Sequence, residues 1–324
     1  MDRGVPDALR KDEEFWFDDG TITLIAEDVQ FRVYKGLLAR LSPVFADMFS
    51  LPQPVTLEDK TGPMRATGSD SATPPVVHLT DAPQAFRILL KAIAPDDDAA
   101  MFEASHPDCF TIASCMRLGH KYQMDKEVGQ CVDYLLQYFP TPYMEFDALE
   151  DLLPPGFEDD STYVIGFINL AQLTGAIHLL PVLFMICVWC LDGDTLLQGV
   201  GWLDASKDTL SPADLARCFD ARRDLTRART NSLRQRIASL PSSGCSHLGA
   251  CKNVLHALFL LAMSDEPYPF VRLCEFPTAQ GLCSACQARL ATLDEEEMSL
   301  IWAELPELVG LGQIEGWGEK RERE

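Results

Sequence analysis

The chain has 324 residues, 47% of them hydrophobic, which suits one large folded domain or two smaller ones and not a disordered tail. Acidic residues outnumber basic ones by 49 to 27, and the formal charge of -22 disfavours direct binding to nucleic acid or to an anionic membrane. Eleven cysteines, together with an N-terminus that lacks the apolar core of a signal peptide, predict a cytoplasmic or nuclear protein whose thiols are free or metal-bound.

The first elements expected along the chain are two strands and two short helices. Residues 21–25 and 29–33 alternate between apolar and polar side chains, as the strands of a hairpin do. Helical spacing follows and is interrupted by Ser42 and Pro43. Ser42 is a good N-cap, and proline suits a first turn because its missing N–H would be unbonded there. The interruption therefore predicts two consecutive helices, the second over residues 43–49.

The next part of the chain contains a loop and further helices. Residues 51–75 are rich in Pro, Gly, Ser and Thr, which predicts a disordered loop insertion. The stretch "PVVHLTD" predicts a strand. Apolar residues at helical spacing predict the helices that follow, over residues 86–93, 110–124 and 128–139.

The order of these blocks resembles a known family. A hairpin leads into "FRVYKGLLARLSPVFADMF", and "VVHLTDAPQAFRILLKAI" and "CMRLGHKYQMDKEVGQCVDYL" follow. This order resembles the BTB (also called POZ) domain. The resemblance implies an α+β fold, a helical cluster with a small sheet, that serves oligomerisation, cullin-type ubiquitin ligase adaptors or transcriptional repression. The second half is similar to that of a fungal group of BTB proteins and is expected to be mainly α-helical.

The resemblance also places a contact face at the sheet edge and the first helix. Its residues are Thr21, Tyr34, Lys35, Leu37 and Leu38. Thr21 and Tyr34 stand where family members usually have Asp and His, so Asp18 or Asp19 would have to supply the carboxylate for Lys35.

We therefore expect a non-enzymatic interaction protein. Its partner would be a second copy of the chain, a cullin-type ligase or a transcription factor. A transcriptional co-regulator recruited by a DNA-binding partner is the alternative, and a zinc- or thiol-dependent enzyme is a further one.

The expected organisation has five parts. These are an N-terminal tail over 1–14, a BTB/POZ domain over 15–140, an acidic linker over 141–160, a helical domain over 161–312 and a tail over 313–324.

One stretch in the second half is free of charge. Residues 164–191 are long enough to span a bilayer, which leaves a membrane helix as an alternative. Internal polar residues, Pro181 and the pair Thr174-Gly175 favour two buried helices joined at that pair. Helical spacing predicts further helices over 211–219, 222–240, 245–261 and 288–305.

Four cysteines form the candidate metal site. Cys283 and Cys286 have the C-x-x-C spacing that lets two thiolates reach one zinc ion. Cys245 and Cys251 are further apart, with His247 between them as an alternative ligand. Four protein ligands would make a structural site, and four buried apolar cysteines are the alternative. Beyond this zinc, no cofactor and no catalytic residue is expected.

Two further patterns admit a functional and a structural interpretation. Cys187 and Cys190 share the C-x-x-C spacing, but their apolar surroundings favour core packing over a redox pair. Arg222, Arg229 and Arg236 repeat every seven residues and share a helix face. That face is expected to be solvated, or else to dock an acidic partner.

Overall fold

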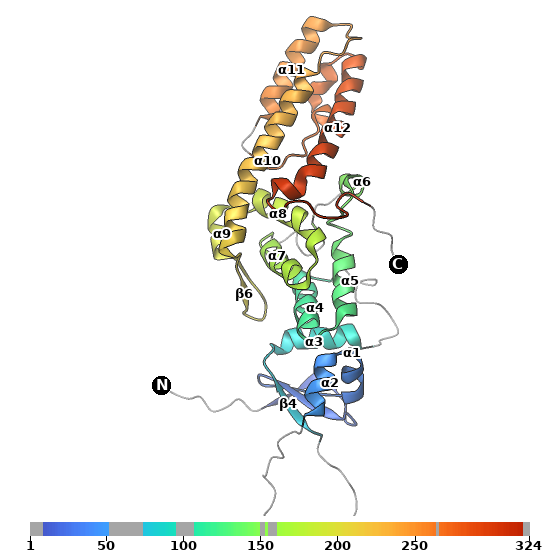
Figure 1. The fold of residues 1–324 in the computed structure, drawn as a ribbon, viewed down its shortest axis with the longest axis vertical. Helices are drawn as coiled ribbons and strands as arrows, with labels where there is room; N and C mark the ends of the chain where they lie inside the picture. Colours follow the sequence, from blue (N-terminus) through green and yellow to red (C-terminus); the bar gives the residue numbers. More distant parts are fainter. Residues whose placement is uncertain are drawn as a thin grey trace, which may run out of the picture. The chain divides into compact units, whose positions relative to one another are not determined.

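The structure is a computed structural model that describes residues 9–51, 74–94, 107–149, 153–154, 161–263 and 266–319. The chain divides into two compact units, Met1–Cys131 and Val132–Glu324 (Figure 1). Its class is α+β with a helical majority. Apart from its two ends, the loop insertion expected over 51–75 lies outside the described residues.

The N-terminal unit holds a four-stranded mixed sheet and its helices. In chain order the elements are β1 (Arg10–Trp16), β2 (Ile22–Ala26), β3 (Val29–Val33), α1 (Lys35–Leu41), α2 (Pro43–Ser50), β4 (Val76–Leu79), α3 (Pro83–Ile93), α4 (Cys109–Lys121) and α5 (Asp125–Leu135), whose residues after Cys131 belong to the second unit. The strand order is β1-β3-β2-β4. Strands β2 and β3 form the expected antiparallel hairpin, while β1 is parallel to β3 and β4 is parallel to β2.

The expected cap between the first two helices is confirmed. The Ser42 hydroxyl accepts a hydrogen bond from the Phe45 N–H at 3.0 Å, and Pro43 occupies the first turn of α2. The same hydroxyl donates to the Tyr122 carbonyl at 2.6 Å. Phe45 in turn stacks on Tyr122, with 4.3 Å between ring centroids. The cap thus starts α2 and also fixes the helix against the core of the unit.

The expected N-terminal tail is shorter than residues 1–14, because β1 begins at Arg10. Asp12 in this strand is only 3% exposed, and its Oδ2 lies 2.6 Å from Nη2 of Arg87 in α3. The strand was missed because its sequence, "RKDEEFW", is mostly charged. A strand at a sheet edge needs only a few inward-facing side chains, here Asp12 and Phe15, and the other charges remain in water.

The C-terminal unit is mainly helical. Its elements are α6 (Tyr143–Asp147), α7 (Tyr163–Thr174), η1 (Ile177–Leu179), α8 (Leu180–Cys190), α9 (Gly193–Gln198), β5 (Val200–Gly201), β6 (Lys207–Asp208), α10 (Pro212–Ala238), α11 (Leu248–Ala262), η2 (Leu273–Glu275), η3 (Pro277–Gly281) and α12 (Ser284–Leu308). Figure 1 shows α10, α11 and α12 side by side. The two helices expected over 211–219 and 222–240 are one helix, α10, because no Gly or Pro interrupts the chain between them.

The charge-free stretch forms two helices, as expected. Helix α7 ends at Gly175, which adopts φ 73° and serves as a left-handed C-cap, and α8 follows after one turn of 3-10 helix. Glycine reaches this conformation without the Cβ penalty that other residues incur. No helix in the described part of the chain is long and apolar enough to cross a membrane.

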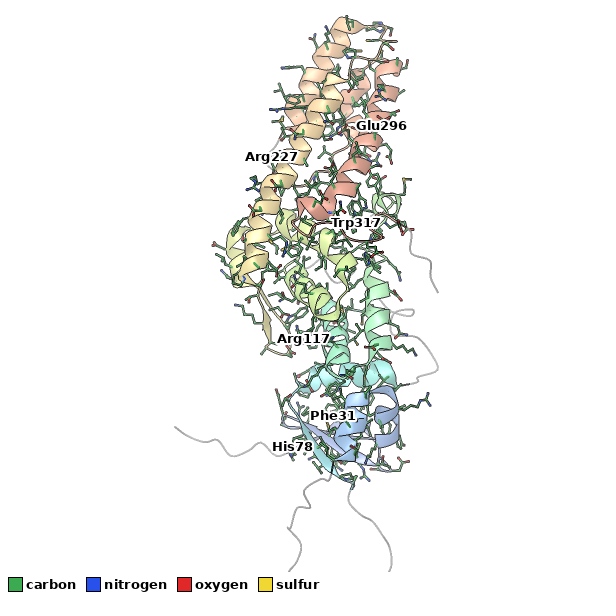
Figure 2. The ribbon with its side chains drawn as sticks, viewed as in Figure 1. Phe31, His78, Arg117, Arg227, Glu296 and Trp317 are labelled. Atoms are coloured by element: carbon green, nitrogen blue, oxygen red, sulfur yellow. The ribbon has the colours of Figure 1, made fainter. Side chains whose placement is uncertain are left out.

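Parts of the expected linker and of the expected C-terminal tail pack against the C-terminal unit. Within the expected acidic linker, Phe146 of α6 stacks on Trp302 at 4.3 Å between ring centroids. Within the expected C-terminal tail, Trp317 (labelled in Figure 2) stacks on the same ring at 5.2 Å. Its indole N–H donates to the Trp302 carbonyl at 2.8 Å. Aromatic side chains bury large apolar areas and so hold both segments against α12. Residues 150–152 and 155–160 of the expected linker lie outside the described residues.

Candidate metal centre

The four candidate cysteines meet where three helix ends converge. Cys245 lies in the loop between α10 and α11, and Cys251 lies near the start of α11. Cys283 is the N-cap of α12, and Cys286 is in its first turn. All four Sγ atoms lie within 4.8 Å of one another. The group could therefore hold a metal ion.

The spacing of the sulfurs agrees with the size of a tetrahedral thiolate site. Four sulfurs at ~2.3 Å from a zinc ion stand ~3.8 Å apart. The Sγ atoms of Cys245 and Cys283 are 3.9 Å apart. All four thiols are free, and their sulfurs need to move by no more than about 1 Å to reach tetrahedral positions.

Local structure around the cluster favours sulfur anions. The Cys283 backbone N–H donates to Cys251 Sγ at 3.4 Å. Helices α11 and α12 both direct their N-terminal ends, with their unpaired N–H groups and positive dipole ends, toward the site. Such a position stabilises a thiolate relative to a thiol. The sequence produces this position by placing Cys251 near the start of α11 and Cys283 directly before α12.

Packing divides the four cysteines into two pairs. Cys251 and Cys286 are 0% exposed and belong to a hydrophobic cluster with side chains from α10, α11, η3 and α12. Cys245 and Cys283 are partly buried and pack at the edge of this cluster. Cysteines acting as small apolar residues would explain the first pair. That alternative does not explain why the second pair also gathers its sulfurs there.

The thiols differ in acidity. Hydrogen bonds from the backbone N–H groups of Ser246 and Cys286 lower the pKa of Cys283 to about 5. Burial raises the pKa of Cys286 to about 12. Without a metal, the Cys283 sulfur is therefore a thiolate beside the protonated Cys286 thiol. A divalent cation would displace the remaining protons, as metal binding to thiols generally does.

The alternative ligand is outside this group. His247 is exposed, and its Nδ1 lies 2.9 Å from the Ser246 hydroxyl. The candidate donor set consists of the four cysteines without it. His247 serves instead as the N-cap residue of α11.

The C-x-x-C at the end of α8 consists of one buried and one exposed thiol. Cys187 is buried, and its hydrogen bond with Cys218 of α10 and its burial both raise its pKa well above the usual range. Burial also raises the pKa of Cys190. Neither thiol has the lowered pKa of a redox-active cysteine. Core packing holds for Cys187, whereas Cys190 is exposed and does not belong to the core.

The heptad arginines form neither a solvated face nor a docking site. Arg229 is 5% exposed and donates to the Ala262 and Tyr268 carbonyls at 3.0 and 3.1 Å. Arg236 is 0% exposed, and its Nη1 lies 2.6 Å from Oδ1 of the equally buried Asp294. Arg222 donates to the Val188 and Leu191 carbonyls at 2.6 and 2.7 Å.

These arginines fasten neighbouring elements of the C-terminal unit to α10. A sequence signal was available, since the arginines share their helix face with buried Leu225 and Leu233. Arginines on the apolar side of a helix are more often paired internally than solvated.

The expected contact face of the N-terminal unit is only partly exposed. Thr21 is exposed, and its hydroxyl accepts the Lys35 N–H at 2.8 Å at the start of α1. Lys35 Nζ donates to the Phe49 carbonyl at 3.2 Å, so it does not use Asp18 or Asp19. Leu37 is half-buried. Leu38 is only 1% exposed and is wrong as a surface residue, because it packs inside the unit.

An exposed aromatic stack that includes Tyr34 lies on this face. Tyr34 is 39% exposed, and its ring stacks on Phe17, itself 37% exposed, with 5.3 Å between centroids. Its hydroxyl donates to Asp19 Oδ1 at 2.8 Å. Phe17 is a residue that the sequence analysis missed. It follows β1, and the charged pattern concealed that strand.

No protein-family profile, no curated protein and no solved structure matches this chain.

Proposed function

We propose that this chain is a non-enzymatic protein–protein interaction protein. Its N-terminal unit carries the contact face, and its C-terminal unit is stabilised by a structural zinc ion. The observation that carries the interaction proposal is the exposed aromatic stack of Phe17 and Tyr34 beside the start of α1.

The aromatic stack has the properties of a binding anchor. The Tyr34 ring is held by Phe17 and by its bond to Asp19, so it is ordered before any partner arrives. Preordered side chains lose little conformational entropy on binding. Tyrosine is also among the residues that most often dominate the energy of interfaces. Asp19, which accepts the Tyr34 hydroxyl, and the exposed Thr21 would contribute polar groups to the rim of the interface.

The resemblance to BTB domains supports the same proposal. The described elements follow the expected order of a hairpin, two helices separated by Ser42, a strand and further helices. We propose a second copy of the chain as the first partner, with a cullin-type ligase or a transcription factor as further partners. The alternative role, a transcriptional co-regulator in the nucleus, requires a DNA-binding partner because the chain carries a formal charge of -22.

The zinc part of the proposal follows from the donor set. Four sulfurs occupy all positions of a tetrahedral ion, which is the pattern of structural sites and leaves none for a water or substrate. This closed shell disfavours the zinc-dependent enzyme. An ion bound here would connect the loop after α10 with the starts of α11 and α12 and so stabilise the fold of this region.

Sedimentation velocity of the full chain from 1 to 50 µM tests the contact face. We expect the wild-type chain to form a dimer and the double variant Phe17→Ala/Tyr34→Ala to be monomeric. Val76→Ala is the matched control, because Val76 is a similarly exposed apolar residue, 46%, on β4 of the same unit. A wild-type chain that stays monomeric at 50 µM, or a double variant that still forms dimers, would refute self-association through this face.

Elemental analysis of the purified chain tests the metal. We expect one zinc per chain in the wild type and its loss in Cys286→Ser. Cys190→Ser is the control, because this thiol is exposed and lies outside the cluster, and it should keep the ion. A wild-type chain without metal even after refolding with added zinc would overturn the zinc proposal.

A further inference from the structure

The cysteine cluster has a protected side and an accessible side. Cys251 and Cys286 are 0% exposed inside the hydrophobic cluster, whereas Cys245 and Cys283 are partly exposed. The Sγ atoms of the accessible pair are in hydrogen-bond contact, 3.9 Å apart. An oxidant that approaches from solvent therefore meets Cys245 and Cys283 first, and meets them together.

We propose that Cys283 and Cys245 form an oxidation site for hydroperoxides, at which a disulfide forms and the metal ion is released. This inference rests on the proposed zinc site for the release step, while the disulfide itself requires only the two sulfurs. The chemical class of the oxidant is a small hydroperoxide such as hydrogen peroxide.

The reaction balances with one peroxide for each cluster. The Cys283 sulfur attacks one peroxide oxygen, an S–O bond forms as the O–O bond breaks, and the departing hydroxide takes a proton to become water. The Cys245 sulfur then attacks the Cys283 sulfur, an S–S bond forms, and the S–O bond breaks to release a second water. Two electrons pass from the two sulfurs to the peroxide. The other two thiolates take up protons as the zinc ion leaves.

The geometry favours this pair over the buried one. The two sulfurs must close from 3.9 Å to ~2.05 Å, a movement of about 2 Å. Cys245 can make it, because it lies in a loop whose neighbours Gly244, Ser246 and His247 are exposed. Cys251 and Cys286 lie within helices and are packed among leucines, so their backbone has little freedom to move.

Loss of the accessible pair would open the metal site. Two remaining cysteines offer only half of the ligands that a tetrahedral zinc ion needs. The new disulfide would keep the loop after α10 attached to α12. The start of α11, which carries Cys251, would lose its link through the metal.

The test is a peroxide titration of the zinc-loaded full chain. Zinc release is followed with a chromogenic chelator, and free thiols are counted before and after. Trypsin separates residues 237–252, which contain Cys245 and Cys251, from residues 273–289, which contain Cys274, Cys283 and Cys286. Cleavage after Glu275 removes Cys274, and fragment-ion spectra of the linked peptides then assign the remaining sulfurs. Cys190→Ser is the control, with an exposed thiol removed outside the cluster.

We expect the loss of one zinc and two cluster thiols per chain, a Cys245–Cys283 cross-link, and the same result in Cys190→Ser. A cross-link between other cysteines, or zinc that stays bound at a tenfold excess of peroxide, would overturn the proposal.

A chain that proves to hold no zinc refutes the metal proposal separately. The oxidation proposal is then decided on the metal-free chain, where a Cys245–Cys283 cross-link supports it and any other outcome refutes it.

Discussion

The buried ion pair between Arg236 and Asp294 leads to a quantitative prediction. Both side chains are 0% exposed, and they join α10 to α12 at 2.6 Å. Asp294 Oδ2 also accepts the Cys274 N–H at 2.8 Å, and Arg236 Nη1 also donates to the Val271 carbonyl at 2.7 Å. The substitution Asp294→Leu removes the carboxylate and leaves a guanidinium buried without a counter-charge.

The expected cost follows from the burial of both partners. Removing one member of a fully buried pair typically lowers the free energy of unfolding by ~3–5 kcal/mol. The free energy of unfolding of a domain is only ~5–15 kcal/mol, so this variant should lose a large share of the stability of the C-terminal unit. Arg236→Met should cost a similar amount, because it leaves the carboxylate unpaired.

The double variant Arg236→Met/Asp294→Leu should cost much less than the sum of the two single variants. It leaves no buried charge, only two unpaired backbone groups at Val271 and Cys274, each worth about 2 kcal/mol. The single variants sum to ~6–10 kcal/mol, so the double variant should fall short of that sum by about 4 kcal/mol. The pair is also incompletely satisfied, since Arg236 Nη2 is buried with no hydrogen-bond partner among the described residues. Replacing the whole ion pair by apolar side chains removes this unpaired group, which lowers the stability cost of the double variant.

Urea unfolding followed by pulsed hydrogen exchange and mass spectrometry is the suitable assay, because peptides from α10 and α12 report the C-terminal unit by itself. Arg223→Met is the matched control on the same helix. Arg223 is 59% exposed and pairs with Asp220 and Asp224 on the surface, so its loss should change the unfolding free energy by less than about 1 kcal/mol. The reasoning would be refuted if the losses of unfolding free energy in the two single variants added up to the loss in the double variant. An Asp294→Leu variant as stable as the control would also refute it.

Three further predictions concern other parts of the chain. Burial acts to raise the pKa of Asp12, but the Arg87 bond and backbone N–H bonds outweigh it and lower the pKa. Stability of the N-terminal unit, measured by urea unfolding, should therefore be full above pH ~4 and fall as pH drops further, and Asp12→Asn should remove this contribution. Gly199→Ala should lower the melting temperature of the C-terminal unit, because φ is 76° and the new Cβ would lie 2.1 Å from the Asp208 carbonyl oxygen. Trp317→Ala should lower the free energy of unfolding, measured in urea, by ~1–3 kcal/mol, because it removes the ring stacked on Trp302 of α12. An unchanged urea midpoint would show that residues 314–319 do not contribute to the stability of the fold.

Local signals in the sequence predicted several elements correctly. Alternation predicted the hairpin of β2 and β3, and Ser42 and Pro43 predicted the break between α1 and α2. Gly175 predicted the end of α7. Each of these signals depends on residues within one or two turns of the chain. Caps, prolines and glycines act over that distance in almost any tertiary context.

The sequence was least informative where charged residues are buried. Strand β1 and the inward arginines of α10 looked like solvated segments, because a charge is normally placed in water. Their burial depends on partners far along the chain, such as Arg87 for Asp12 and Asp294 for Arg236. No local pattern identifies such a partner.

The cysteine cluster shows how the two kinds of information divide. By itself, the sequence determined the C-x-x-C at the start of α12 and proposed the ligand set. Only the tertiary structure decided that Cys245 and Cys251 join it, across the 31 residues between Cys251 and Cys283, and that His247 does not. The physical reason is that ligand spacing within one helical turn is a local property. The meeting of a loop and two helix ends depends instead on how α10, α11 and α12 pack around their shared apolar core.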